Sequence, residues 1–285
     1  MAGKFIYFAI APFRRTTWRL ARRLYCVSRG EPQKHDIASD GEEYVQRCVL
    51  VATQNEHSIN VADIGANRGD WSLSFLNAHA QFGDIDSTVQ LHLFEPEPNA
   101  HASLQGRFSA PASATTRLHL LALSDSEGSA KLARVAPQSG RNTLVPGADT
   151  CAKDEVDVRT TTLSIFCRDH GIDHLQLVKT DTEGHDLAVM RGARDLLASG
   201  HIDVYQFEYN HTWVYARAFL RDVFELTAGL PYRIARLRPA SIEILNAWHP
   251  ELERFFHANY LLVREPALEW FDVHYGNFDE RNTYA

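Results

Sequence analysis

Residues 59–71, INVADIGANRGDW, decide the fold of this chain. A short apolar run ends in Asp63, two glycines follow at Gly65 and Gly69, and a helical pattern of apolar residues begins after them. This order is typical of a strand that turns tightly into a helix and leaves free N–H groups facing a ligand. Taken alone the pattern is loose, because an ordinary turn between a strand and a helix uses the same residues.

The composition indicates one large domain. The chain has 285 residues, of which 45% are hydrophobic, so it can bury a sizeable core. Its net charge of −7 gives little reason to expect nucleic acid as a partner. The four cysteines lie far apart without a Cys-x-x-Cys pair, which argues against a zinc knuckle and favours a reducing cytoplasm. No apolar run approaches the ~20 residues of a membrane span, so we expect neither a transmembrane helix nor a signal peptide.

The N-terminal segment, residues 1–35, differs from the rest in charge. Residues 1–30 contain seven basic residues and no acid. Apolar residues recur there at roughly helical spacing, namely Trp18, Ala21, Leu24, Tyr25 and Val27. The pattern predicts an amphipathic helix with two open interpretations. It lies on an anionic membrane, peripherally at the inner face, or it packs on its own domain with a solvated basic face.

The rest of the chain alternates strands and helices. Strands are expected at residues 59–64, 89–94, 118–123, 175–180, 203–208, 232–237 and 259–263. The order predicts an α/β fold over residues 36–265, with a doubly wound, mostly parallel seven-stranded sheet that binds ligands beyond the carboxyl ends of its strands. Residues 129–162 interrupt the alternation and predict an inserted β-hairpin, which holds an acceptor or is a plain surface excursion. Residues 266–285 form a tail without a motif.

A nucleoside cofactor is expected at the ends of the first three strands. Glu95 ends the second strand, where an acid accepts hydrogen bonds from ribose hydroxyls in nucleotide-binding sheets. Asp125 follows the third strand and either reaches the base or is a plain turn acid. The candidate cofactor-binding residues are Asp63, Gly65, Ala66, Asn67, Gly69, Glu95, Pro96, Ser124 and Asp125.

Acidic side chains follow the next two strands. Asp181 ends the fourth strand and Glu208 ends the fifth, so both belong to the edge of the sheet where ligands bind. One interpretation is a site for a hard divalent cation such as Mg²⁺, with Asp181, Glu208 and Asn210 as oxygen ligands. The other is a general base, in which Asp181 and Glu208 act with His211 to remove a proton from a hydroxyl group.

Five blocks of sequence, in order, resemble the FkbM-type S-adenosylmethionine-dependent methyltransferases. They are residues 61–69, 93–96, 122–125, 161–163 and 178–184 with 191–193. The resemblance implies a class I methyltransferase (Rossmann-like) fold, S-adenosylmethionine as cofactor, and methylation of a hydroxyl on a sugar, glycan or secondary metabolite. It also implies that Lys179, Asp181 and Glu183 form the family's signature rim, so Lys179 joins the catalytic candidates Asp181, Glu208 and His211.

Two rival functions are compatible with parts of the pattern. A glycine turn followed by an acid also suits a nicotinamide-dependent oxidoreductase, although no tyrosine is followed four residues later by lysine. A non-catalytic scaffold bound to a membrane is the other rival, because of the basic N-terminus. The expected partner is a small-molecule or glycan acceptor, and the sequence leaves the acceptor's identity and the oligomeric state open.

Overall fold

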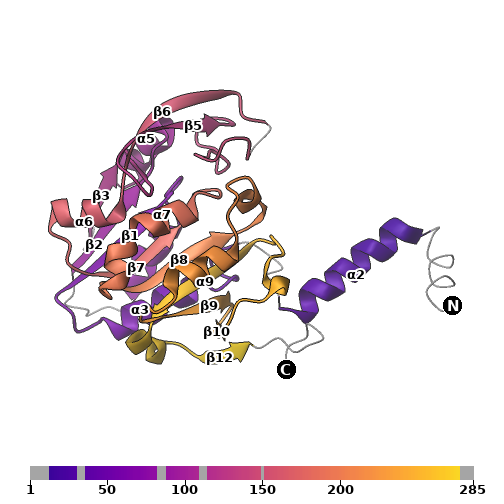
Figure 1. The fold of residues 1–285 in the computed structure, drawn as a ribbon. Helices are drawn as coiled ribbons and strands as arrows, with labels where there is room; N and C mark the ends of the chain where they lie inside the picture. The colour runs from indigo at the N-terminus through magenta and orange to yellow at the C-terminus, as the bar shows by residue number, and fades with distance from the viewer. Residues whose placement is uncertain (1–12, 31–35, 82–87, 109–113, 149–150, 277–285) are drawn as a thin grey trace.

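A nine-stranded sheet forms the centre of the protein. The computed structural model describes residues 13–30, 36–81, 88–108, 114–148 and 151–276. The order of strands across the sheet is β12-β10-β9-β11-β8-β7-β1-β2-β3 (Figure 1). Their bounds are β1 Ser58–Ile64, β2 Thr88–Phe94, β3 Ala114–His119, β7 Leu175–Thr180, β8 Ile202–Tyr209, β9 Tyr232–Arg238, β10 Ser241–Leu245, β11 Ala258–Arg264 and β12 Val273–Gly276.

The central strands run parallel and end at one edge. β1 pairs in parallel with β2 on one side and with β7 on the other, and β7 pairs in parallel with β8. Every residue of β7 and β8 is buried, as expected for strands covered on both faces. β11 is antiparallel to both β8 and β9, so the beginning of β11 lies at the same edge as the end of β8.

Helices cover both faces of the sheet. Val45 and Val49 of α3 and Phe75 of α4 share one core with Val61 of β1, whereas α6 to α9 pack in a second core against its neighbour Ala62. Successive residues of a strand point to opposite faces, so this division confirms the doubly wound arrangement. The helices are α3 Glu42–Ala52, α4 Asp70–Gln81, α5 Pro98–Arg107, α6 Leu163–His170, α7 Asp186–Gly192, α8 Arg194–Ala198 and α9 Leu220–Thr227.

The third predicted strand is wrong in position. β3 ends at His119, and residues 122–123 form β4 (Ala122–Leu123), which belongs to a separate three-stranded sheet with β5 (Gly128–Arg134) and β6 (Asp154–Thr161). The apolar run that suggested a strand crosses the turn between the two sheets, with Leu120 half exposed. β5 and β6 are antiparallel, which confirms the inserted hairpin.

The sheet also has two strands that the sequence did not predict. β10 pairs antiparallel with β9, and β12 pairs in parallel with β10. Both are short and lie at the outer end of the sheet. The sheet therefore extends beyond residue 265, where we expected a tail to begin.

The predicted N-terminal helix is present as α2 (Arg14–Ser28), and none of its residues is buried. Figure 1 shows α2 leading away from the body of the protein. Little of the surface of α2 therefore packs on its own domain, and the membrane interpretation stays a prediction. Across the described ranges, no helix combines the length and hydrophobicity that a membrane crossing requires.

Candidate functional site

The turn after β1 approaches the end of β7 closely. Gly65 has φ +80° and Gly69 has φ +75°, a backbone conformation that side chains disfavour. A Cβ atom on Gly65 would lie 2.0 Å from the carbonyl oxygen of Asp181, and one on Gly69 would lie 2.5 Å from the ring of Phe108. Both glycines are thus required by space as well as by conformation.

Glu95 ties this turn to the end of β2. Its two carboxylate oxygens accept hydrogen bonds from the N–H groups of Asn67 and Glu97, both at 2.8 Å. Burial raises the pKa of Glu95 to about 7. A carboxylate has about four lone-pair positions, so the two that remain can accept hydrogen bonds from a ligand. The binding of ribose hydroxyls by Glu95 stays a prediction, and its free lone pairs are compatible with it.

A first pocket opens beside Glu95. Four of the predicted cofactor-binding residues line it, namely Gly65, Asn67, Glu95 and Pro96. The other predicted residues, Asp63, Ala66, Gly69, Ser124 and Asp125, do not line it. Asp63 is fully buried and accepts a hydrogen bond from Ser72, so it supports the turn from behind. Asp125 is exposed and lines a different surface pocket, because the third strand ends earlier than predicted.

Ser124 reaches the first pocket only through a neighbour. Its hydroxyl lies 2.9 Å from Nε2 of His185, and His185 lines the pocket. Burial lowers the pKa of His185. No local pattern in the sequence points to His185, because it follows the fourth strand and only the fold brings it beside the loop after β4.

The inserted hairpin supplies a wall that sequence reasoning missed. Its connecting loop lines the first pocket through Ser139, Gly140, Asn142, Thr143 and Leu144. The hydroxyl of Thr143 donates to the carbonyl of Glu183, 2.9 Å away, so the loop also contacts the segment after β7. No local sequence signal assigns these residues to a cofactor site, because the contact depends on how the small sheet folds over the large one.

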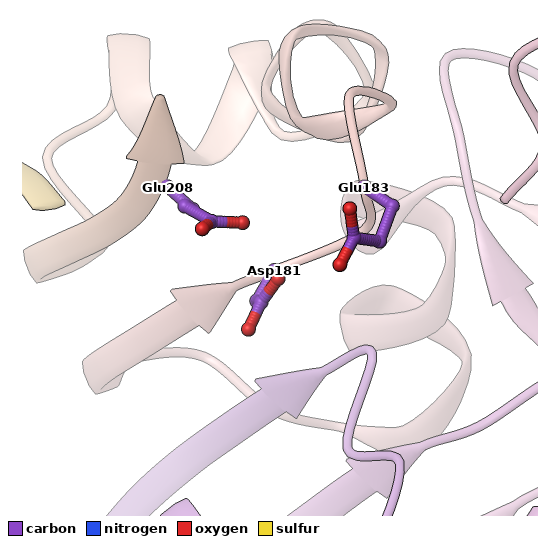
Figure 2. Close-up of side chains that lie close together, drawn as sticks. All are labelled: Asp181, Glu183 and Glu208. Atoms are coloured by element: carbon purple, nitrogen blue, oxygen red, sulfur yellow. The ribbon is translucent and has the colours of Figure 1, made fainter. Parts of the chain in front are cut away.

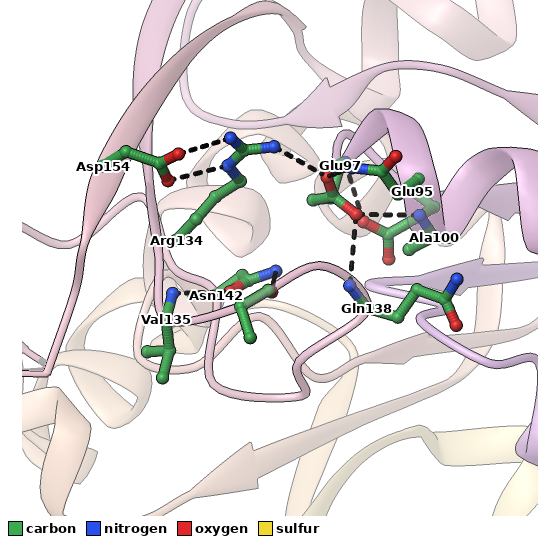
Figure 3. Close-up of polar contacts among 10 residues, drawn as sticks. Glu95, Glu97, Ala100, Arg134, Val135, Gln138, Asn142 and Asp154 are labelled. Atoms are coloured by element: carbon green, nitrogen blue, oxygen red, sulfur yellow. Dashed lines mark hydrogen bonds and ion pairs between the residues drawn. The ribbon is translucent and has the colours of Figure 1, made fainter.

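Glu97 anchors this loop (Figure 3). Its carboxylate caps α5 by accepting from the N–H of Ala100 at 2.8 Å, and it also accepts from the N–H of Gln138 and from Arg134. Arg134 in turn pairs with Asp154 on β6. Burial alone raises the pKa of Glu97, but its hydrogen bonds from Ala100 and other donors outweigh this and hold the pKa below its ordinary value. One buried carboxylate therefore holds the loop, the helix and the hairpin together.

Three carboxylates meet where β7 and β8 end. Asp181 follows β7, Glu183 lies on the loop before α7, and Glu208 lies near the end of β8 (Figure 2). One oxygen from each lies within 4.8 Å of the others. Burial, with the charges of Glu208 and Asp181, raises the pKa of Glu183 to about 9. Burial and Asp181 raise the pKa of Glu208 well above its ordinary value.

Lys179 offsets the negative charge of these carboxylates from a buried position. Its ammonium lies 3.3 Å from Asp181 and 3.6 Å from Asp63, and its side chain is almost fully buried. Burial alone lowers the pKa of Lys179, but the charges of Asp181, Asp63 and Glu42 outweigh it and raise the pKa. Lys179 therefore stays protonated and lines neither pocket, so its position suits a counter-ion rather than a proton acceptor.

Lys179 also affects Asp181. Burial alone raises the pKa of Asp181, but the ammonium of Lys179 outweighs it and holds the pKa below its ordinary value. Of the three clustered carboxyls, Asp181 is therefore the one that stays ionised, while Glu183 and Glu208 retain protons near neutral pH.

A second pocket lies on the other side of the carboxylates. Its lining residues are Arg141, Thr143, Ala148, Asp181, Glu183, Glu208, Asn210, His211, Thr212 and His257. Asn210 uses its side-chain oxygen to cap the short helix His211–Val214, accepting from the N–H of Thr212 at 2.7 Å. Glu183 is the third member of the group of carboxylates, and the role of Asn210 as a metal ligand stays a prediction.

His257 is the imidazole that contacts Glu208. Its Nδ1 lies 2.5 Å from the carboxylate, whereas His211 is exposed at the rim of the same pocket. Burial lowers the pKa of His257. The sequence analysis did not assign His257, because only the antiparallel direction of β11 brings the beginning of that strand back to the end of β8.

The two pockets meet at three residues. Thr143, Asp181 and Glu183 line both of them. A ligand in the first pocket and a ligand in the second pocket would therefore face each other across these side chains. This geometry can support a transfer between two bound molecules, with carboxyl groups at the point of transfer.

Comparison with known proteins gives one family. The model of the methyltransferase FkbM domain matches residues 63–251. The comparison with curated proteins gives no match.

Several solved structures are similar to this chain at low identity. The methyltransferase FkbM from Methylobacillus flagellatus is 14% identical, with a TM-score of 0.45, over 72% of this chain and 44% of that one. The carbon methyltransferase CurJ is 7% identical, with a TM-score of 0.40, over 78% and 54%. The 1,6-didemethyltoxoflavin-N1-methyltransferase from Burkholderia thailandensis is 10% identical, with a TM-score of 0.35, over 93% and 90%. This chain spans less than half of the FkbM structure, and the family assignment rests on the family model.

Proposed function

The chain belongs to the FkbM methyltransferase family, and on that premise we propose that it transfers a methyl group from S-adenosylmethionine to a hydroxyl of a sugar, glycan or secondary metabolite. The observation that supports this proposal is the meeting of the two pockets at Asp181, Glu183 and Thr143. The first pocket would hold the cofactor and the second would hold the acceptor.

The residues of the first pocket fit this cofactor. Glu95 offers lone pairs for ribose hydroxyls, and the turn at Gly65 keeps backbone close to the ligand. Leu121, Leu123 and Leu132 give the pocket apolar surface suited to a flat base. S-adenosylmethionine supplies a methyl group on a positively charged sulfur, and the C–S bond breaks as the acceptor oxygen bonds to that carbon. The family assignment favours this cofactor over the nicotinamide and scaffold alternatives.

The carboxyl cluster would activate the acceptor. A hydroxyl becomes a good nucleophile only when its proton is removed, and a base works best when its pKa lies near the working pH. Glu208 contacts His257 on one side and belongs to the cluster with Asp181 on the other. We propose that Glu208 passes its own proton to Nδ1 of His257 as it takes the acceptor proton, while ionised Asp181 orients the hydroxyl toward the first pocket.

A divalent cation is the second version of this step. Asp181, Glu183 and Glu208 offer three oxygens within 4.8 Å of one another, which suits a hard ion such as Mg²⁺. The ion would increase the acidity of an acceptor hydroxyl bound to it. In that version Glu183 and Glu208 lose their protons when the ion binds, so binding becomes tighter as the pH rises.

One experiment tests both versions. Purified protein is freed of metal with a chelator and incubated with radiolabelled S-adenosylmethionine and panels of sugars, glycans and hydroxylated metabolites. If label is transferred in the absence of metal, the result supports activation of the acceptor by a general base. If transfer requires added Mg²⁺, the result supports activation by a bound cation. Thermal unfolding with S-adenosylhomocysteine and with NAD is measured in parallel, because a bound ligand raises the melting temperature. A rise with NAD alone contradicts the proposed function.

A further inference from the structure

α2 does not pack against the hydrophobic core of the protein. It has fifteen residues, and none is buried. An isolated helix of this length is marginal in water, and most helices in proteins are stabilised by packing an apolar face. Contacts with the body occur toward its C-terminal end, where Tyr25 donates to Glu251 and the carbonyl of Arg29 accepts from Arg236. The rest of the helix lies away from the sheet (Figure 1).

A stripe of large apolar side chains runs along this helix. Phe13, Leu20, Leu24 and Val27 are 67%, 57%, 60% and 54% exposed. Their spacings of seven, four and three residues put them on one face of a helix. We call these four residues the apolar stripe.

The apolar stripe faces away from the body of the protein. The guanidinium of Arg22 lies over the ring of Phe256, 4.8 Å from its centre, so the Arg22 side of the helix faces the body. Leu20 and Leu24 are each two residues from Arg22, and residues so spaced point to nearly opposite sides of a helix. The apolar stripe is therefore open to an external partner.

The charge of α2 is opposite to that of the rest of the chain. The helix carries five arginines and no acid, namely Arg14, Arg15, Arg19, Arg22 and Arg23. The whole chain has a net charge of −7 and residues 1–30 carry +7, so the remaining residues carry −14. None of the arginines lies within the apolar stripe. An acidic body with a basic, apolar helix is attracted to an anionic surface through that helix alone.

We propose that α2 lies in the plane of an anionic lipid surface, with the apolar stripe among the lipid chains and the arginines other than Arg22 at the level of the phosphates. A helix with one apolar face and arginines beside it binds bilayers in this way, since arginine can extend its charged end to the phosphates. Each arginine near an anionic bilayer strengthens binding about fivefold, so the four that do not face the body give strong attraction at low salt. This binding of α2 to lipid does not depend on the methyl transfer proposed above.

The test uses the full-length protein and vesicles. Vesicles of phosphatidylcholine alone are compared with vesicles in which about one third of the lipid is phosphatidylglycerol, and the bound fraction is measured by sedimentation. We expect binding to the anionic vesicles that weakens as salt is added. The double variant Leu20→Gln/Leu24→Gln should bind at least about tenfold more weakly, because two buried apolar side chains are lost. Arg15→Gln/Arg19→Gln should lose about fivefold for each arginine.

Matched controls separate docking from folding. Leu120→Gln replaces a leucine that is 50% exposed and lies outside α2, and it should bind vesicles as the wild type does. Thermal unfolding without vesicles should be the same for all variants, because α2 buries no residue. Equal vesicle binding by the wild type and the stripe variant overturns the proposal. So does a wild-type dimer in vesicle-free buffer that becomes monomeric in the stripe variant, because a second copy then covers the stripe.

Discussion

The two pockets that share Asp181 differ in whether backbone or side chains shape them. The first pocket is shaped by backbone, since glycines allow the close approach and Glu95 is held by N–H groups of the turns. The second pocket is shaped by charged side chains, with three carboxylates beside His257. Both pockets contain carboxyl groups that titrate, because the pKa of Glu95 is about 7 and that of Glu183 is about 9. The difference is that the glycine turn keeps its shape at any pH, whereas the charge of the acceptor side depends on several carboxyls at once.

The largest expected effect is a loss of methyl transfer when Glu208 of the second pocket is replaced. Glu208→Gln removes an ionisable group that lines only the second pocket. We expect methyl transfer to fall about 100- to 1000-fold, the usual contribution of a general base, while the affinity for S-adenosylhomocysteine stays unchanged. Turnover and calorimetry are measured on the same preparation. Glu155→Gln, an exposed acid on β6, is the control. Weaker cofactor binding with full turnover would reverse the roles of the two pockets.

A smaller effect should come from the backbone side. Gly65→Ala places a Cβ atom 2.0 Å from the Asp181 carbonyl at a positive φ. Strain and overpacking should cost about 3 kcal/mol in the free energy of unfolding, and S-adenosylhomocysteine should bind about 100-fold more weakly. Denaturant unfolding and calorimetry measure both.

Gly106→Ala is the matched control for this change. Gly106 lies in α5, and a Cβ atom there meets nothing within 4 Å. Gly106 is the last residue but one of α5, where alanine is at least as favourable as glycine, so this variant should be as stable as the wild type or more stable by up to about 0.5 kcal/mol. A Gly65→Ala protein that binds the cofactor normally would contradict the backbone account of the first pocket.

The anchor of the inserted loop should have an intermediate effect. Glu97→Gln weakens the hydrogen bonds that hold α5, Arg134 and the loop at Gln138. We expect about tenfold weaker cofactor binding, because hydrogen bonds to a charged group contribute about 1.5–3 kcal/mol and part of that holds the loop. Asp154→Asn, which touches the same Arg134 from an exposed position, should change the affinity less than about threefold. Equal effects of the two variants would mean that the loop needs no buried anchor.

The smallest effect concerns pH. The pKa of Glu183 is about 9 in the folded protein against an ordinary value of 4.5, so the unfolded chain releases this proton first as the pH rises. The contribution of Glu183 to stability is full below pH 4.5 and is lost by about pH 9. The melting temperature should fall over this range, and Glu183→Gln should remove about 2–4 °C of the fall. Glu127→Gln, an exposed acid, should leave the slope unchanged.

The sequence predicted the two regions unequally, for physical reasons. Gly65, Asn67 and Glu95 follow two strands whose apolar runs are plain, and the carboxyl ends of neighbouring parallel strands lie at one edge of a sheet, so the pattern placed these residues at the first pocket. The wall from residues 139–144 and the contact of His257 with Glu208 depend on how distant segments fold together. Nothing within either segment indicates its neighbour.

The strands of the large sheet were also predicted with unequal success. β7 was predicted with its observed bounds because Leu175, Leu177 and Val178 stand between Gly171 and the acidic stretch that begins at Asp181. β3 was displaced because most of its residues are polar, while the more apolar stretch after it is a turn. β10 and β12 are five and four residues long and lie beyond the central strands, where periodicity over so few residues carries little signal.

The reversed direction of β11 has a consequence for any attempt to shorten the protein. The family match ends at residue 251, seven residues before β11 begins. A fragment cut at that boundary would keep the glycine turn and all three carboxylates, yet it would expose the hydrogen-bonding edges of both β8 and β9. Unpaired edges of long apolar strands recruit other chains. Such a fragment should therefore aggregate during expression, even though it carries every block of sequence by which the family is identified.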